Sequence, residues 1–208
     1  MTSDRPDSYC YPGTTVLRNY LDLTDADELA AAEQIPVGLR SLELFAYLPS
    51  PPHDLNCLLS IHRKLFEKLY PFAGEVRVHT GRMTKIRSTG SGIVYGDSDF
   101  ILEQLSVLFR DFSAENALTG LSLESFAQRA AHFYGEFDAV HPFREGNSRT
   151  LRIFFSSVAK TAGFRLGWDA IDATEGGRQQ LYTARDIAVM RANSAPLAAL
   201  FASILSPV

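Results

Sequence analysis

Apolar residues recur every three or four positions over most of the chain, which is the pattern of amphipathic helices. The clearest case is the segment 53–70, whose apolar stripe includes His62. We interpret this histidine as a core residue whose polarity is satisfied by a hydrogen bond. Further helices are predicted to start near Asp97, Ser122, Asn147, Thr174 and Ser194. The pattern therefore predicts an all-α domain.

The first fifty residues carry weaker signals. Residues 1–13 are predicted to form a loose leader, and a short helix is expected over 16–21. Thr24 is predicted to cap a helix running toward Phe45, because acidic residues follow it where the helix dipole favours negative charge. Pro36 is expected to break or kink that helix.

Residues 71–96 depart from the helical pattern. β-favouring pieces near 76–78 and 93–95 flank a tract rich in serine and glycine, which predicts a small hairpin. We call this hairpin the flap and bound it at 78–96. Its glycines superficially resemble a phosphate-binding loop. Their spacing misses the dinucleotide fingerprint by one residue and no strand–turn–helix unit surrounds them, so we reject that interpretation.

Composition narrows the function classes. The chain has 208 residues, 46% hydrophobic and 21% charged, as expected for one globular domain with a sizeable core. A net charge of −4 argues against broad attraction to nucleic acid or to an anionic membrane. No secretory signal is visible, and no apolar run reaches the roughly 20 residues that span a bilayer. Cys10 and Cys57 fit no metal pattern, so we expect free thiols and a cytoplasmic location.

One stretch concentrates the polar chemistry: residues 141–152 read HPFREGNSRTLR between two predicted helices. The turn at 146–148 offers free backbone N–H groups at a helix start, and its small side chains let an anion approach. Arg149 and Arg152 lie three residues apart and so share a helix face. Because cations are unfavourable at the positive end of a helix dipole, these arginines indicate a bound anion such as a triphosphate.

Two further side chains of this stretch suit phosphoryl chemistry. Glu145 is its lone acid, and one carboxylate with phosphate oxygens commonly holds a nucleotide-bound Mg²⁺. His141 is predicted at the end of the preceding helix, where a neutral imidazole could take a proton from an attacking hydroxyl. Each residue alone could equally cap a helix or form an ion pair. Their joint spacing favours the functional interpretation.

The sequence HPFREGNSRTLR closely resembles HxFx(D/E)GNGRxxR, the signature of the Fic (filamentation induced by cAMP) family. Similar pieces occur at 11–13, 17–19, 61–77 and 163–164, so the resemblance covers most of the chain. It implies a Fic fold, an all-α core with a hairpin flap, as a single domain over 1–208. It also implies a protein adenylyltransferase that transfers AMP from ATP, with Mg²⁺, to a serine, threonine or tyrosine hydroxyl of a target protein.

The resemblance also assigns roles to individual residues. His141 matches the general base and Glu145 the Mg²⁺ ligand. The phosphates are assigned to the turn and the two arginines, that is, to Gly146, Asn147, Ser148, Arg149 and Arg152. The flap is implied to align the target by main-chain pairing, with docking residues Thr84, Lys85, Gly90, Gly92, Ile93 and Tyr95. Adenine is expected to lie near 182–190.

Ser148 departs from the family signature, which has glycine there. A serine still offers its backbone N–H, so the anion site can form provided that the residue avoids positive φ. Many relatives carry an internal inhibitory helix in which Ser or Thr is followed four residues later by Glu and then Gly or Asn. Here Thr24 and Glu28 are followed by Leu29, so the pattern is incomplete. The chain therefore resembles single-domain bacterial toxins that are inhibited by a helix of a separate small antitoxin. Similar toxins modify type II topoisomerase subunits, which makes these candidate targets.

Two alternatives stay open. A Doc-like variant of the fold binds the nucleotide reversed and acts as a protein kinase that transfers the γ-phosphate. Retention of Gly146, Asn147 and Arg152 favours AMP transfer over that variant. The other alternative is a catalytically silent module that binds a nucleotide or a partner. His141 and Glu145 argue against it, and Ser148 is the one feature in its favour.

Overall fold

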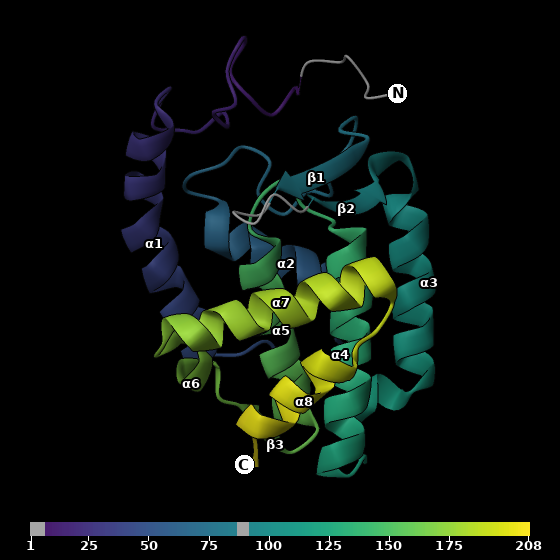
Figure 1. Ribbon diagram of the computed structural model, residues 1–208. Helices are drawn as coiled ribbons and strands as arrows, with labels where there is room; N and C mark the ends of the chain where they lie inside the picture. Colours follow the sequence, from purple (N-terminus) through teal and green to yellow (C-terminus); the bar gives the residue numbers. More distant parts are fainter. Residues whose placement is uncertain (1–6, 87–91) are drawn as a thin grey trace.

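The computed structural model, whose described residues are 7–86 and 92–208, is dominated by helices (Figure 1). The helices are α1 (Ala26–Ala46), α2 (Leu55–Phe66), α3 (Ile101–Ala114), α4 (Leu123–Val140), α5 (Asn147–Thr161), α6 (Trp168–Asp172), α7 (Glu175–Arg191) and α8 (Ala195–Ile204). The strands are β1 (Arg82–Ile86), β2 (Gly92–Asp97), β3 (Phe164–Leu166) and β4 (Leu205–Pro207), and single 3₁₀ turns occupy Ser98–Phe100 and Asn116–Leu118. The predicted all-α fold with a small hairpin is confirmed.

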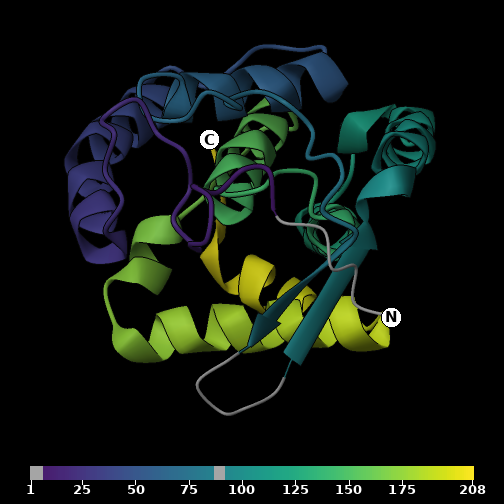
Figure 2. The same cartoon turned by 90° about the horizontal axis from the view of Figure 1, so that it is seen from above.

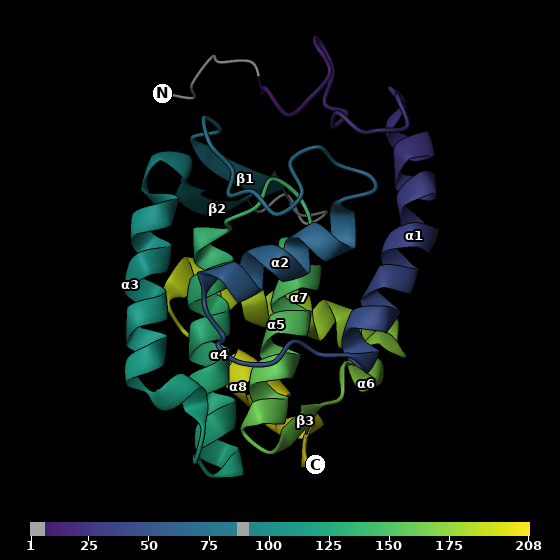
Figure 3. The same cartoon turned by 180° about the vertical axis from the view of Figure 1, so that it is seen from behind.

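The core forms around α4 and α5, which are consecutive in the chain. Nearly every side chain of α5 from Leu151 to Ala159 is buried, which suits a helix enclosed on all sides. Helix α7 lies in front of α5 in Figure 1. Helix α2 packs on the opposite side of α5, which faces the viewer in Figure 3. Because α4 ends and α5 begins at the same end of the molecule, the loop 141–146 lies beside the hairpin at that end (Figure 1).

The N-terminal segment differs from its prediction. No helix forms over 16–21; the chain runs as a loop in which Cys10 pairs with Leu17 through an isolated β-bridge. The Asn19 side chain accounts for this. Its amide donates to the carbonyls of Leu17 and Leu23 and accepts from the N–H groups of Leu21 and Leu23. Such local bonds compete with helix formation. Residues 7–13 are not a loose leader either, because Cys10 is buried.

Helix α1 is continuous across Pro36, against the expected break. Pro36 is exposed, so the helix hydrogen bond that it cannot make lies on the solvent side. The cap also shifts by one residue. Asp25, rather than Thr24, accepts hydrogen bonds from the N–H groups of Asp27 and Glu28.

The hairpin is present, but its first strand lies later than predicted. β1 and β2 are antiparallel, with Thr84 opposite Val94 and Lys85 opposite Ile93. Residues 76–78 are not a strand. Seen from above, the hairpin crosses over α7 (Figure 2). A second small sheet, β3 with β4, was not predicted; it brings the segment after α5 against the end of α8. Among the described residues, no helix is both long and apolar enough to cross a membrane.

Candidate active site

The loop between α4 and α5 forms the floor of a cavity of about 250 Å³. Its walls come from the hairpin and from α7, and the residues lining it include Lys85, Tyr95, His141, Glu145, Ser148 and Arg185. Both ends of the loop adopt left-handed backbone: His141 has φ 51° and Gly146 has φ 79°. The predicted base and the predicted anion site are therefore brought together, as expected from the sequence.

Gly146 is required by its conformation and by its neighbour. A Cβ atom added to it would lie 2.2 Å from Cε2 of Phe66, in addition to the strain of a positive φ. As the N-cap of α5, it has no side chain that could accept from the first-turn N–H groups of the helix. Free N–H groups at a helix start suit an anion, so the anion site predicted for the turn at 146–148 stays a prediction that this geometry permits.

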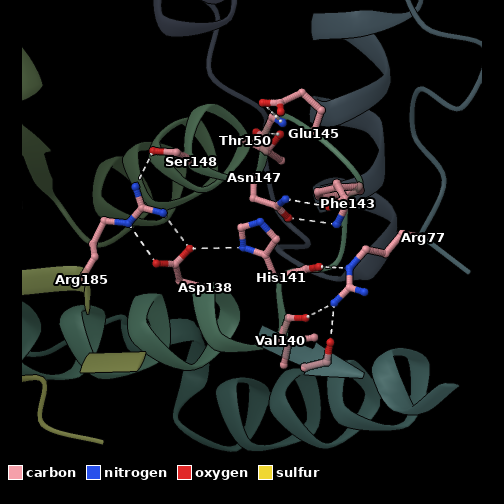
Figure 4. Close-up of polar contacts among 12 residues, drawn as sticks. Arg77, Asp138, Val140, His141, Phe143, Glu145, Asn147, Ser148, Thr150 and Arg185 are labelled. Atoms are coloured by element: carbon pink, nitrogen blue, oxygen red, sulfur yellow. Dashed lines mark hydrogen bonds and ion pairs between the residues drawn. The ribbon is translucent and has the colours of Figure 1, made fainter. Parts of the chain in front are cut away.

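Asn147 braces the loop with its side chain. Its Oδ1 accepts from the Phe143 N–H at 2.9 Å, and its Nδ2 donates to the Phe143 carbonyl at 2.7 Å (Figure 4). Asn147 is 4% exposed. Because its side chain is engaged with Phe143, Asn147 could contact a phosphate only through its backbone N–H. Phe143 itself is fully buried.

Arg77 holds the other end of the loop and was not recognised from the sequence. Its buried guanidinium donates to the carbonyls of Val140 and His141 at the end of α4. It also donates to the carbonyls of Gly81, just before β1, and of Gly96, near the end of β2, which both lie at the open end of the hairpin. Burial lowers the pKa of Arg77 to about 10, so it stays charged at neutral pH. One side chain thus fastens the hairpin to the loop 141–146.

His62 links α2 to the same loop. It is fully buried; its Nδ1 accepts from the Gly74 N–H at 2.8 Å, and its Nε2 lies 3.0 Å from the Glu145 carbonyl oxygen. Its ring stacks on Phe143 at 3.9 Å. Burial lowers the pKa of His62 to about 4, so it is neutral. The core interpretation holds, with two hydrogen bonds in place of the one expected.

His141 ends α4 and faces the cavity. Its ring stacks on that of Tyr95 with 3.7 Å between centroids. Burial lowers the pKa of His141 below its ordinary 6.5, although the Asp138 carboxylate opposes this shift. The imidazole is therefore neutral at pH 7, the state that a general base requires.

Glu145 turns its carboxylate toward the anion site. Its Oε1 accepts from the Gly146 N–H at 2.8 Å and lies 3.3 Å from Nη2 of Arg149. The side chain is 44% exposed. Within 7–86 and 92–208, no group of three or more His, Cys, Asp or Glu could hold a metal ion. Glu145 could hold a metal only together with oxygens from a ligand.

The two predicted phosphate arginines have different partners. Arg149 forms an ion pair with Glu33 of α1 and lies over the ring of Phe66. Arg152 pairs with Asp172 of α6 at 2.7 Å and lies over the ring of Trp168. They share a face of α5, as expected, but neither lines the cavity. Triphosphate binding by either arginine requires it to exchange its carboxylate partner.

Ser148 has a partner that the sequence did not suggest. Its Oγ accepts a hydrogen bond from Nη1 of Arg185 in α7 at 2.9 Å (Figure 4). Arg185 also forms a buried bidentate pair with Asp138 of α4. Ser148 lies within α5 and has no positive φ, so the condition for its backbone N–H to join the anion site is met. Charged residues on the apolar stripes of α4 and α7 are the signal that could have revealed Asp138 and Arg185.

The predicted flap residues divide into two groups. Thr84 and Lys85 line the cavity, and Gly92 is exposed at the start of β2. The side chains of Ile93 and Tyr95 are 1% and 5% exposed, so they face the core and His141 rather than a partner. Gly90 lies outside the described residues.

A wider cleft of about 810 Å³ lies on the outer side of β2, against α3 and α4. It shares Tyr95 with the smaller cavity, and Val189 is its one residue from the region 182–190 where adenine is expected. Its charged lining is mainly acidic, with Asp97, Glu103 and Glu136. Such a lining disfavours a phosphate, so we assign the chemistry to the smaller cavity.

The helical core, the hairpin and the loop between α4 and α5 define a class of protein. The model of the Fic/DOC family matches residues 52–159, and the chain belongs to this family. A probable protein adenylyltransferase Fic of Salmonella typhimurium is 34% identical over 195 residues, covering 89% of each chain. Protein adenylyltransferase VbhT of Bartonella schoenbuchensis is 33% identical over 84% of this chain, which spans 35% of VbhT.

Solved structures agree with this assignment. BepC from Bartonella tribocorum, with bound AMPPNP, gives a TM-score of 0.80 at 28% identity, covering 96% of this chain and 97% of that one. The N-terminal Fic domain of a Bep effector protein from Bartonella quintana, with bound ADP, gives 0.81 at 26% identity. That match covers 96% of this chain and 94% of that one. These likenesses confirm the predicted Fic fold.

Proposed function

We propose that this member of the Fic/DOC family is a protein adenylyltransferase, which transfers AMP from ATP to a serine, threonine or tyrosine hydroxyl of a target protein. The observation that carries the proposal is the placement of a neutral His141, whose side chain is 14% exposed, in one cavity with the N-terminal N–H groups of α5. The names of its relatives, which include several protein adenylyltransferases, support the same reaction.

In the proposed reaction, His141 accepts the proton of the target hydroxyl as that oxygen attacks the α-phosphorus of ATP. A new oxygen–phosphorus bond forms, the bond between the α-phosphorus and the β-bridging oxygen breaks, and pyrophosphate leaves. The N–H groups at the start of α5 stabilise the negative charge that develops on the α-phosphate. Arg149 and Arg152 bind the β- and γ-phosphates after exchanging Glu33 and Asp172 for the ligand.

Mg²⁺ fits this site through Glu145. The carboxylate is half-exposed, lines the cavity and lies beside the anion site, and one carboxylate suffices for an ion held mainly by phosphates. When bound, the ion would neutralise charge on the phosphates. Glu145 would then give up its hydrogen bond to the Gly146 N–H, which frees that donor for the nucleotide.

The flap is proposed to hold the target chain. β1 and β2 form a two-stranded sheet, so each strand has an outer edge on which an extended segment of a target could pair. Thr84, Lys85 and Gly92 are the residues that we propose accept it. The side chains of Ile93 and Tyr95 support the hairpin from within.

Labelled ATP distinguishes the candidate reactions. Purified protein, free of any antitoxin, is incubated with bacterial lysate and ATP labelled on the α- or the γ-phosphate. We expect label on protein from α-labelled ATP. Label from γ-labelled ATP alone would support the Doc-like kinase, and no label from either would support the silent module.

Replacing His141 by Ala tests the base directly. We expect transfer to fall about 10²- to 10⁴-fold, the usual contribution of general base catalysis, with ATP binding largely retained. The measurement is the initial rate of α-label transfer, with ATP affinity measured on the same preparation. Wild-type transfer by this variant would exclude His141 as the base.

We further propose that the protein is the cytoplasmic toxin of a toxin–antitoxin pair, with type II topoisomerase subunits as candidate targets. The sequence contains no complete inhibitory motif, so inhibition would have to come from a separate helix near Arg152. An exposed apolar stripe on α1, formed by Ile35, Leu39 and Leu42, supports a helical partner. Affinity purification from the native host should recover a small protein. A harmless, active chain purified without one would contradict this part of the proposal.

A further inference from the structure

Asp138 and Arg185 form a buried ion pair that the proposed reaction does not use. The residues are 1% and 5% exposed. Nε of Arg185 donates to Oδ2 of Asp138 at 2.9 Å and Nη2 donates to Oδ1 at 2.7 Å, which is a bidentate fork. Taking two charges out of water is costly, and replacing such a pair by apolar residues often does not destabilise a protein. Stability alone therefore does not explain this pair.

The pair points at the base. Oδ1 of Asp138 lies 3.8 Å from Nδ1 of His141, and the two residues are one turn apart at the end of α4 (Figure 4). This separation is too long for a hydrogen bond, and the buried Nδ1 has no hydrogen-bond partner within the described residues. A carboxylate facing Nδ1 favours the tautomer that carries its proton there. The lone pair of the neutral ring is then on Nε2.

The second arm of the pair reaches the anion site. Nη1 of Arg185 donates to Oγ of Ser148, so one guanidinium contacts both the end of α4 and the start of α5. A glycine at position 148, as in the family signature, has no side-chain acceptor for this bond. The serine therefore adds a connection between the base and the phosphate-binding helix start.

The charges around His141 come from three parts of the fold. Asp138 lies on α4, Arg185 on α7 and Arg77 ahead of the hairpin, while Tyr95 of β2 stacks on the ring. Asp138 favours the imidazolium form of His141, and the two arginines disfavour it. Of these groups, Asp138 is thus the one that can stabilise the positive charge that His141 acquires with the target proton.

We propose that Asp138 and Arg185 are positioning residues for catalysis: Asp138 sets the tautomer of His141 and stabilises its protonated form, and Arg185 holds Asp138 in place and anchors Ser148. This inference rests on the proposed role of His141 as the base. It assigns to Ser148 the role of binding Arg185. It also predicts that the Asp138–Arg185 pair affects turnover more than nucleotide binding.

The test compares Asp138→Asn with the double variant Asp138→Asn/Arg185→Gln. The single variant leaves Arg185 buried without its counter-ion and can fail to fold; the double variant removes both charges. The double variant, and the single one where it folds, should lower kcat for transfer of α-labelled AMP roughly 10-fold or more, because a neutral amide no longer fixes the tautomer. KM for ATP should stay within about twofold, as expected for an interaction made only in the transition state.

The pH profile separates positioning from a structural role. In Asp138→Asn, loss of the carboxylate lowers the pKa of His141 further, so the acid limb of kcat moves to lower pH while the plateau is lower. Ser148→Ala removes one arm and should give a smaller loss of kcat. The matched control is Arg40→Gln/Glu43→Gln, which removes an exposed pair on α1 and should behave as wild type.

Folded Asp138→Asn/Arg185→Gln protein with wild-type kcat and pH profile would overturn the proposal. So would a loss of ATP affinity as large as the loss of kcat, since it would indicate damage to the whole site. Wild-type turnover of Ser148→Ala would remove the Ser148 arm. Activity of His141→Ala is measured alongside; if it is retained, the proposed base is wrong, and that failure is distinct from failure of the positioning pair.

Discussion

Gly146 illustrates how a single residue of the central stretch serves both fold and function. The sequence explains it by the need for close approach of an anion. The structure adds two stronger reasons, a φ of 79° and the ring of Phe66 directly where a side chain would begin. Flexible side chains can move aside for a new atom, but Phe66 is fully buried and packs against His62. The predicted anion site therefore depends on a contact with α2.

Gly146→Ala should lower the free energy of unfolding by about 2–4 kcal/mol, the combined cost of a left-handed alanine and of overpacking against Phe66. Gly120→Ala is the matched control, because Gly120 also has positive φ but no atom lies within 4 Å of the point that an alanine Cβ would occupy. It should cost about 1–2 kcal/mol. Urea unfolding of the two variants gives the comparison. Equal losses would show that the Phe66 contact is unimportant.

At the scale of elements, the hairpin is held to the loop 141–146 by Arg77 rather than by its own strands. A two-stranded hairpin is marginal in water by itself. The Arg77 guanidinium supplies support through carbonyls on both strands' sides at the open end of the hairpin and at the end of α4. The position of Tyr95 over His141 follows from this attachment.

Arg77→Met should lower the free energy of unfolding by roughly 2–4 kcal/mol, because four carbonyls that are buried or partly buried lose a charged donor. It should also lower AMP transfer, since the hairpin and His141 lose their common anchor. Arg82→Met, an exposed change in β1, should alter stability by less than about 0.5 kcal/mol. Thermal unfolding and the rate of α-label transfer are the measurements. Full activity of Arg77→Met would contradict this account of the hairpin.

At the scale of the whole molecule, buried histidines make stability depend on pH. Burial lowers the pKa values of His53, His62 and His141 in the folded protein. The unfolded chain, with ordinary values near 6.5, therefore binds more protons below that pH. The contribution of these neutral histidines to folding stability is therefore fully present above pH 6.5 and is lost as the pH is lowered toward 4.

We expect the free energy of unfolding in urea to be smaller at pH 5 than at pH 7.5. Lowering the pKa of His62 to about 4 corresponds by itself to roughly 3 kcal/mol over the full range down to pH 4. Replacing His62 by Gln should reduce this pH dependence, although it also lowers stability at pH 7.5. Identical unfolding free energies of the wild type at the two pH values would be inconsistent with neutral buried histidines.

The sequence predicted most elements through their periodicity and caps. Asp97, Ser122 and Thr174 are N-caps in the structure, and α5 begins at Asn147 as expected. The prediction of elements failed where a side chain redirects the backbone. The Asn19 side chain hydrogen-bonds backbone groups of the segment that was predicted to be helical over 16–21. Pro36 is exposed, and α1 continues across it. The Asn19 bonds are local, but neither they nor the exposure of Pro36 are registered by hydrophobic periodicity and cap signals.

By itself, the sequence determined the helical class and the local order of the base, the acid and the helix start, because 141–152 is one continuous segment. Only the tertiary structure decided which distant groups surround it. Arg185, Arg77 and His62 contact this segment from positions 37, 64 and 83 residues away, and side chains so far apart meet only when the core has packed. The residues predicted to carry the chemistry lie in one local segment, whereas the charged groups around them come from distant parts of the chain.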